Sequence, residues 1–261
     1  IGNKGGFHNR ITKQIHLFPF TLNECEELFS LNALLNASAA QSLVYYEGLI
    51  QQINDIVMLA TGYNTLVKDL KVANAALDAL SVTLTAEQVN TFKGYHNSVA
   101  AFVNYDNAVT NATSQDDVNN ALAAIEEKFD VVAYGAQTYA NAAIAVVAAK
   151  TTIAGLTNLL PAHITSYNTF CDDTLPFDDY NTSFSDILAN YTDVAGAKSD
   201  IDNILDVNNN DLDVITYAAT QYNALLGVAA INNAAIDNLA NLDSDAKDDF
   251  KEDVADAVDF T

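Results

Sequence analysis

The residues best suited to chemistry in this chain are three oxygen-bearing side chains at alternate positions, Asp206, Asn208 and Asn210. An EF-hand takes its first calcium ligands from alternate loop positions in this way. The rest of the motif departs from the pattern, because Asp211 stands where the loop requires Gly and Tyr217 where it requires a bidentate Glu. We therefore interpret the run as a polar turn between helices, keep these three residues as the calcium candidate, and expect no other metal or cofactor.

The other ionisable side chains form no catalytic pattern. Carboxylates in a polar linker rarely acquire the shifted pKa values that acid–base catalysis needs, and four acids share such a stretch: Asp172, Asp173, Asp178 and Asp179. His96 falls on the apolar side of a predicted helix, where we expect a hydrogen-bonded core histidine. The remaining histidines lack a ligand partner at helical spacing: His8, His16 and His163. The chain also has no nucleophile elbow, Cys-x-x-Cys pair or phosphate loop, so we expect no enzyme.

Composition argues against two classes of partner. The formal net charge is −23, from 34 Asp and Glu against 11 Lys and Arg. A field of that sign repels nucleic acid and anionic membrane surfaces, so we expect neither as a partner. The longest uninterrupted apolar run, residues 142–149, is far shorter than the roughly 20 residues that cross a bilayer, and we expect no transmembrane segment.

Two cysteines, Cys25 and Cys171, are too few to define a disulfide framework or a metal site. They either form one bridge in an oxidising compartment or remain free buried thiols. The sequence leaves both states open.

The element that organises the chain is a long helix predicted over residues 118–146. Steps of four and three separate its apolar and small residues, the spacing that keeps one helix face against a partner. These residues are Val118, Leu122, Ile125, Phe129, Val132, Ala136, Tyr139, Ala143 and Val146. Between Val131 and Cys171 only Lys150 is charged, so we expect this helix to lie inside the fold, capped by residues 114–117 and stopped before Pro161.

Helical spacing recurs along most of the chain, and no stretch alternates long enough to predict a sheet. We expect an interruption near Gly62, a capping box at 85–88 and a terminal helix capped by Ser244. The expected stripes run over residues 43–60, 66–84, 89–103, 184–191, 212–240 and 250–258. The predicted fold is all-α, an elongated bundle of long antiparallel helices with coiled-coil-like packing. Its predicted parts are an N-terminal segment (1–35) and two bundle halves (36–171 and 182–261), joined by the acidic linker 172–181.

Residues 3–31 have a different character, with a short basic run before the first helix. They contain Asn-Lys-Gly-Gly-Phe-His-Asn-Arg-Ile-Thr at 3–12 and Pro-Phe-Thr at 19–21. This stretch resembles a segment of a prokaryotic AAA-type P-loop ATPase family, which implies a short strand followed by a helix. The family's activity needs a Gly-x-x-x-x-Gly-Lys-Ser/Thr loop that this chain lacks, so nucleotide chemistry does not carry over. We interpret the segment as borrowed or fused.

These features favour a non-enzymatic structural or interaction protein that is secreted or exposed at the cell surface. It would associate with itself or with another protein through helix faces rich in Ala and Tyr, since Tyr is favoured at interfaces. The alternative for these tyrosines is that they seal the edges of the core. Alternative functions are a helical pore-forming toxin or translocator that uses residues 131–171, an ATPase-associated fragment, and a carrier of apolar small molecules.

Overall fold

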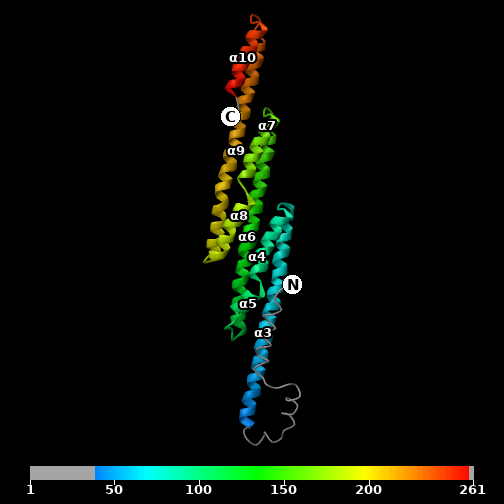
Figure 1. The fold of residues 1–261 in the computed structure, drawn as a ribbon, viewed down its shortest axis with the longest axis vertical. Helices are drawn as coiled ribbons and strands as arrows, with labels where there is room; N and C mark the ends of the chain where they lie inside the picture. Colours follow the sequence, from blue (N-terminus) through cyan, green and yellow to red (C-terminus); the bar gives the residue numbers. More distant parts are fainter. Residues whose placement is uncertain (1–38, 259–261) are drawn as a thin grey trace. The chain divides into compact units, whose positions relative to one another are not determined.

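The computed structural model describes residues 39–258, with the backbone alone at 39–44 and 206–210. Within this range the chain is helical and contains no strand, which confirms the all-α fold class with long antiparallel helices. The segment predicted as 1–35, with the ATPase-like residues 3–31, His8, His16 and Cys25, lies outside the described residues. Figure 1 shows the elements in chain order: α3 (Ala39–Asp78), η2 (Ala79–Val82), α4 (Ala86–Val99), α5 (Phe102–Ala108), α6 (Gln115–Ala154), α7 (Pro161–Asp173), α8 (Phe177–Asn190), α9 (Val194–Asp237) and α10 (Ser244–Ala257).

Contacts within the chain divide it into two compact units. Of the described residues, unit 1 comprises 39–76 together with 91–130, and unit 2 comprises 77–90 together with 131–258. One division therefore falls inside α6. The predicted linker 172–181 lies within unit 2 and does not separate the units. Most of it is helical, since α7 continues to Asp173 and α8 begins at Phe177. Asp178 and Asp179 occupy the first turn of α8, where the positive end of the helix dipole stabilises carboxylates.

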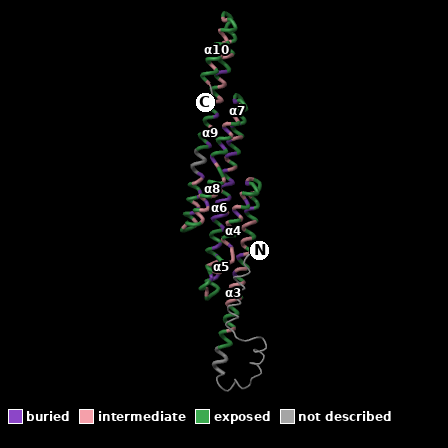
Figure 2. Tube along the Cα trace, in the orientation of Figure 1, coloured by how far each residue is buried: buried purple, intermediate pink, exposed green. Residues whose placement is uncertain are grey.

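The long central helix of the sequence prediction is α6, and its stripe is buried as expected. Figure 2 shows buried positions recurring along this helix. Val118 and Val132 are completely inaccessible, Phe129 is 5% exposed, and Ala143 alone of the predicted stripe is half-buried. The cap is also confirmed, since the amide of Asp117 donates to Ser114 Oγ and the carboxylate of Asp117 accepts from the amide of Ser114.

The core of unit 1 forms where α3 meets α5 and α6. Its buried members are Leu66, Ala100, Tyr105, Val109, Val118, Leu122, Ile125 and Phe129. The expected interruption of the first helix near Gly62 is wrong, because α3 continues through it. A Cβ atom at Gly62 would collide with the Tyr105 hydroxyl and with Val118, so this glycine permits close packing and does not end the helix.

The helix that follows the capping box at 85–88 is shorter than predicted. The box itself is present, with the Thr85 amide bonded to Gln88 Oε1 at 2.9 Å and the Gln88 amide to Thr85 Oγ1 at 3.3 Å. Helix α4 ends at Val99, and α5 begins at Phe102 after an extended Ala101. This break turns Tyr105 into the core and leaves Val103, a predicted stripe residue, half exposed.

The core of unit 2 forms where α6 and α7 meet α9. Its buried members are Val146, Ala149, Ile153, Leu159, Tyr167, Cys171, Leu212 and Ala219. The predicted turn at 208–210 is wrong, since α9 remains helical through these residues. The final hairpin pairs α9 with α10 across a short connection. Asp243, and not the predicted Ser244, caps α10 by accepting a 2.9 Å hydrogen bond from the Ala246 amide.

Candidate functional site: association surfaces

His96 is a core residue of unit 1, as its place on the apolar side of a helix predicted. Its side chain is fully buried, with Nε2 3.2 Å from the Phe129 carbonyl oxygen and Nδ1 3.1 Å from Asn74 Oδ1. Burial lowers its pKa below the usual value of a histidine, and the hydrogen bond to Phe129 offsets part of this effect. A neutral imidazole therefore joins α3, α4 and α6.

The other described candidates, His163 and the four acids at 172–179, form no metal-binding group. The Leu160 amide donates a 3.3 Å hydrogen bond to His163 Nδ1 at the start of α7. Lys150 forms an ion pair with Asp172. Among the described residues, no group of three His, Cys, Asp or Glu side chains is placed to hold a metal ion.

The calcium candidate of the sequence analysis falls on helical backbone. Asp206, Asn208 and Asn210 belong to α9, and their side chains lie outside the described residues. An EF-hand takes its ligands from a loop closed by a tight Gly turn. The helical backbone here does not have that geometry.

Cys171 lies completely buried in the core of unit 2. Burial raises the pKa of its thiol, so the reactive thiolate is disfavoured. Cys25, the other cysteine, lies outside the described residues.

Four tyrosine hydroxyls donate hydrogen bonds to backbone carbonyls far away in the sequence. Tyr105 bonds Leu59 at 2.6 Å, Tyr139 bonds Leu175 at 3.1 Å, Tyr180 bonds Gly135 at 2.8 Å and Tyr222 bonds Val258 at 2.9 Å. Each ring buries apolar area while its tip satisfies a polar group. Tyr105, Tyr139 and Tyr222 hold the core together in this way, as the second of the two interpretations of the sequence expected, whereas Tyr180 lay in the predicted linker.

The first half of α3 carries an apolar stripe that remains exposed. Its residues follow the four-three spacing of a coiled-coil seam, and we call them the α3 face: Tyr46, Ile50, Ile53 and Val57. The side chains of Ile50, Ile53 and Val57 are each 58–59% exposed. The spacing of the sequence predicted this stripe but did not indicate that it stays exposed, unlike the stripe at 66–84, in which Leu66 and Leu77 are buried. Apolar residues exposed at this spacing are typical of a surface on which another helix can pack.

Helix α9 is apolar on two opposite faces. One face packs into unit 2 through Leu212, Ala219 and Ala229. The opposite face, which we call the α9 face, consists of exposed residues at three-four spacing: Val214, Tyr217, Gln221, Ala224, Val228, Ile231 and Ala235. The sequence analysis missed this second seam because the first one accounted for the helix. The feature that indicates it in the sequence is the absence of any charged residue from Val214 through Ile236.

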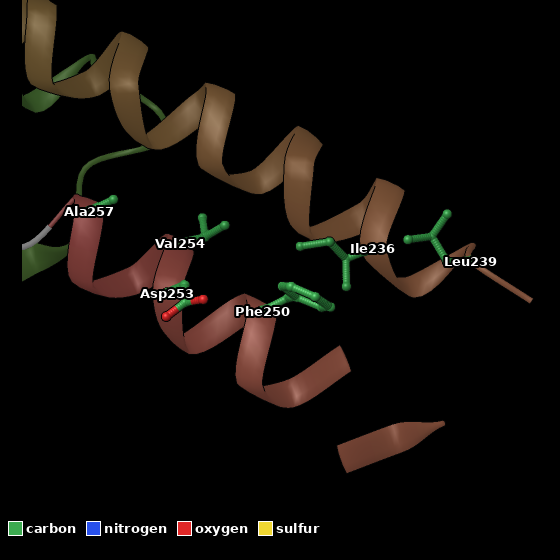
Figure 3. Close-up of a pocket in the computed structure, with 6 residues that line it drawn as sticks. All are labelled: Ile236, Leu239, Phe250, Asp253, Val254 and Ala257. Carbon is green, nitrogen blue, oxygen red and sulfur yellow. The ribbon is translucent and has the colours of Figure 1, made fainter. Parts of the chain in front are cut away.

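An apolar groove lies between α9 and α10. Figure 3 shows Ile236 from α9 close to Phe250 from α10, with Val254, Asp253 and Ala257 of α10 and Leu239, just beyond the end of α9, completing the lining. Phe250 remains 50% exposed. Ligand sites combine an apolar wall with a few converging polar groups, and here the lining offers one carboxylate.

By length and composition, two helices of the described chain are apolar enough to cross a membrane. They are Gln115–Ala154, with 44% of its most apolar window buried, and Asp211–Asp237, with 11% buried. The first supplies the core, as a buried helix of a folded bundle does. The second owes its low burial to the exposed α9 face. The expectation of no transmembrane segment rested on uninterrupted apolar runs, and it stays a prediction.

The fold defines a protein of the all-α class with long, antiparallel-packed helices. Comparisons with protein-family models, with curated proteins and with solved structures found no match for this chain. The function is therefore argued from the surfaces themselves.

Proposed function

We propose that this chain is a non-enzymatic structural or interaction protein that associates with itself through exposed apolar helix faces. The observation that carries the proposal is the exposure of apolar residues at coiled-coil spacing on α3 and on α9. Residues with this spacing insert as knobs into the holes of another helix. Burying these residues against another helix would stabilise the assembly by roughly 25 cal/mol for each Å² of apolar area removed from water.

The distribution of charge supports the same function. The chain carries a formal net charge of −23, which keeps the unassembled protein soluble and opposes random contact between copies. The α3 face contains no charged residue, and the nearby acids Glu47 and Asp55 lie on the same helix turns outside the seam. Association is then restricted to the uncharged seams. We place the protein outside the cell or on its surface, and labelling of intact cells with a membrane-impermeant reagent checks this location.

Light scattering on charged variants of the α3 face tests the proposal. Ile50→Glu and Ile53→Glu together put carboxylates in the seam and should reduce the mass of the assembly, while circular dichroism remains that of the wild type. Glu47→Gln and Asp55→Asn, which lie on the same helix turns outside the seam, serve as the control and should not weaken association. A wild-type chain that is monomeric throughout the micromolar range would refute self-association.

A second candidate function is membrane insertion by a pore-forming protein or translocator. The observation that favours it is helix Asp211–Asp237, which is long and apolar enough to span a bilayer and of whose most apolar window only 11% is buried. The stretch first considered for this role, 131–171, instead supplies buried core residues such as Val131, Tyr139 and Ile153. Leakage of a trapped dye from neutral vesicles on addition of the purified chain would support insertion, and intact vesicles would argue against it.

A further inference from the structure

We propose that the α9 face is the contact between two copies of this chain, paired antiparallel about a two-fold axis near Tyr222 and Asn223. The inference rests on the proposed self-association and adds to it the helix, the orientation and the register. In this arrangement Val214 faces Ile231 of the second copy, and Tyr217 faces Val228 of the second copy.

The first argument is the burial pattern along α9. Leu212 and Ala219 are 6% and 0% exposed on the inner face, whereas Val214, Tyr217 and Ile231 are 65%, 66% and 70% exposed on the outer one. A helix that is apolar on all sides is normally covered on all sides. The outer residues follow one another at steps of three and four, so the cover that fits them is a helix with the same spacing. A second copy of α9 has that spacing.

The second argument is charge, which also sets the orientation. No charged residue lies between Val214 and Ile236, so two acidic chains that meet here bring no like charges into direct contact along the face. Acids border the face at Asp211 and Asp213 at one end and at Asp237 at the other, and Asp237 is paired with Lys251 of its own chain. In a parallel pair each of these acids would lie beside the same acid of the second copy, and like charges at such short distances repel each other. In the antiparallel register Asp213 lies opposite Asn232 and Asp211 opposite Ala234, both uncharged.

The third argument is the match of side chains along the antiparallel pair. The larger apolar residues meet each other toward the two ends, Val214 with Ile231 and Tyr217 with Val228. At the centre Gln221 meets Ala224 of the second copy, which leaves room for the longer amide side chain. A single polar residue in a seam fixes the register at some cost in stability. The contact would be about 32 Å long at 1.5 Å per residue, at the small end of specific interfaces, so we expect a dimer in the micromolar range.

Sedimentation of the full chain across the micromolar range tests the contact. Ile231→Glu places a carboxylate opposite Val214 in both halves of the pair and should weaken the dimer at least tenfold. Val82→Glu is the matched control, because Val82 is 91% exposed and the change in charge is the same. Circular dichroism of both variants should match the wild type.

Cysteine cross-linking tests the orientation, in a chain that carries Cys25→Ser and keeps the buried Cys171. A mixture of Val214→Cys and Ile231→Cys chains should form a disulfide heterodimer, whereas Val214→Cys alone should not, since its two copies lie near opposite ends of the contact. A homodimer of Val214→Cys would overturn the antiparallel register.

The outcomes separate this inference from the proposed function. If the wild type associates and Ile231→Glu associates equally well, the α9 contact is refuted and self-association stands. If the wild type stays monomeric, both are refuted. Vesicles of neutral phosphatidylcholine identify the other occupant of the face. The wild-type chain would then bind these vesicles, Ile231→Glu would abolish the binding, and no dimer would form without vesicles. That result would assign the α9 face to lipid and overturn the pairing.

Discussion

Replacing Phe129 with Ala is the most direct test of α6 as the buried helix around which unit 1 is built. The Phe129 ring is 5% exposed and lies in the core cluster with Leu122 and Ile125. It meets the His96 ring edge-on, with centroids 5.0 Å apart. Truncation to Ala removes the buried ring and leaves a cavity that the surrounding helices fill only in part, so we expect a loss of about 3–5 kcal/mol in the free energy of unfolding.

The matched control is Glu127→Gln on the exposed side of the same helix. It should change the free energy of unfolding by less than about 0.5 kcal/mol, as exposed substitutions do. Urea titrations followed by circular dichroism give both values, with the slope against denaturant kept similar to the wild type. If Phe129→Ala cost less than about 1 kcal/mol and instead reduced the mass of the assembly, the stripe would be an association surface and the described core would be wrong.

Three further predictions address packing, pH and the N-terminal segment. Gly135→Ala should destabilise unit 2 by roughly 1–3 kcal/mol, because the new methyl group collides with the buried Phe184 ring. Its control is Gly94→Ala in α4, where the methyl group meets no atom within 4 Å and should stabilise the chain by up to about 1 kcal/mol. Thermal melts in which both changes were stabilising would contradict this packing. Burial, with a smaller contribution from Asp178, raises the pKa of Tyr139 to about 12, so the folded chain holds a proton that the unfolded chain releases near pH 10, and the stability that Tyr139 contributes below pH 10 is lost as the pH rises toward 12. Denaturant titrations should show that Tyr139→Phe loses less stability than the wild type over that interval, and parallel profiles would refute the shift. Deleting residues 1–31 should leave a helical chain that melts cooperatively, since both described cores draw on residues beyond 58; a collapse of the circular dichroism signal would show that the bundle depends on the segment.

The sequence predicted the helices well because their periodicity reports directly on which side is buried. Eight of the nine stripe residues predicted from spacing alone are buried, and the capping box at 85–88 and the cap at 114–117 were predicted from the hydrogen-bonding ability of Ser, Thr, Asp and Gln near helix starts. Gly62 and the Asn-rich run at 208–210 were misread as breaks. Local propensity disfavours a helix at both places. At Gly62 packing overrides this propensity, because the glycine lets Tyr105 approach, and the backbone of α9 stays helical through 208–210.

The candidate surfaces were harder to predict, because periodicity shows that a stripe is apolar and does not show what covers it. The stripe of Tyr46 and Ile53 has the same pattern as that of Leu66 and Leu77, yet only the second is buried. The role of Tyr180 was missed because its neighbouring acids suggested a linker, although its hydroxyl bonds to Gly135 within the core. Such contacts depend on which distant segments meet, and a single sequence does not carry that information.

Self-association is the central claim, and the molar mass of the wild-type chain as a function of concentration tests it most directly. Light scattering coupled to size exclusion should give 28.0 kDa for the monomer at high dilution and an increase to at least twice that mass as the concentration rises through the micromolar range. Because the seams are apolar, the larger species should persist in high salt, where contacts between exposed charges are screened. A mass that stayed at 28.0 kDa across the whole range would contradict the account.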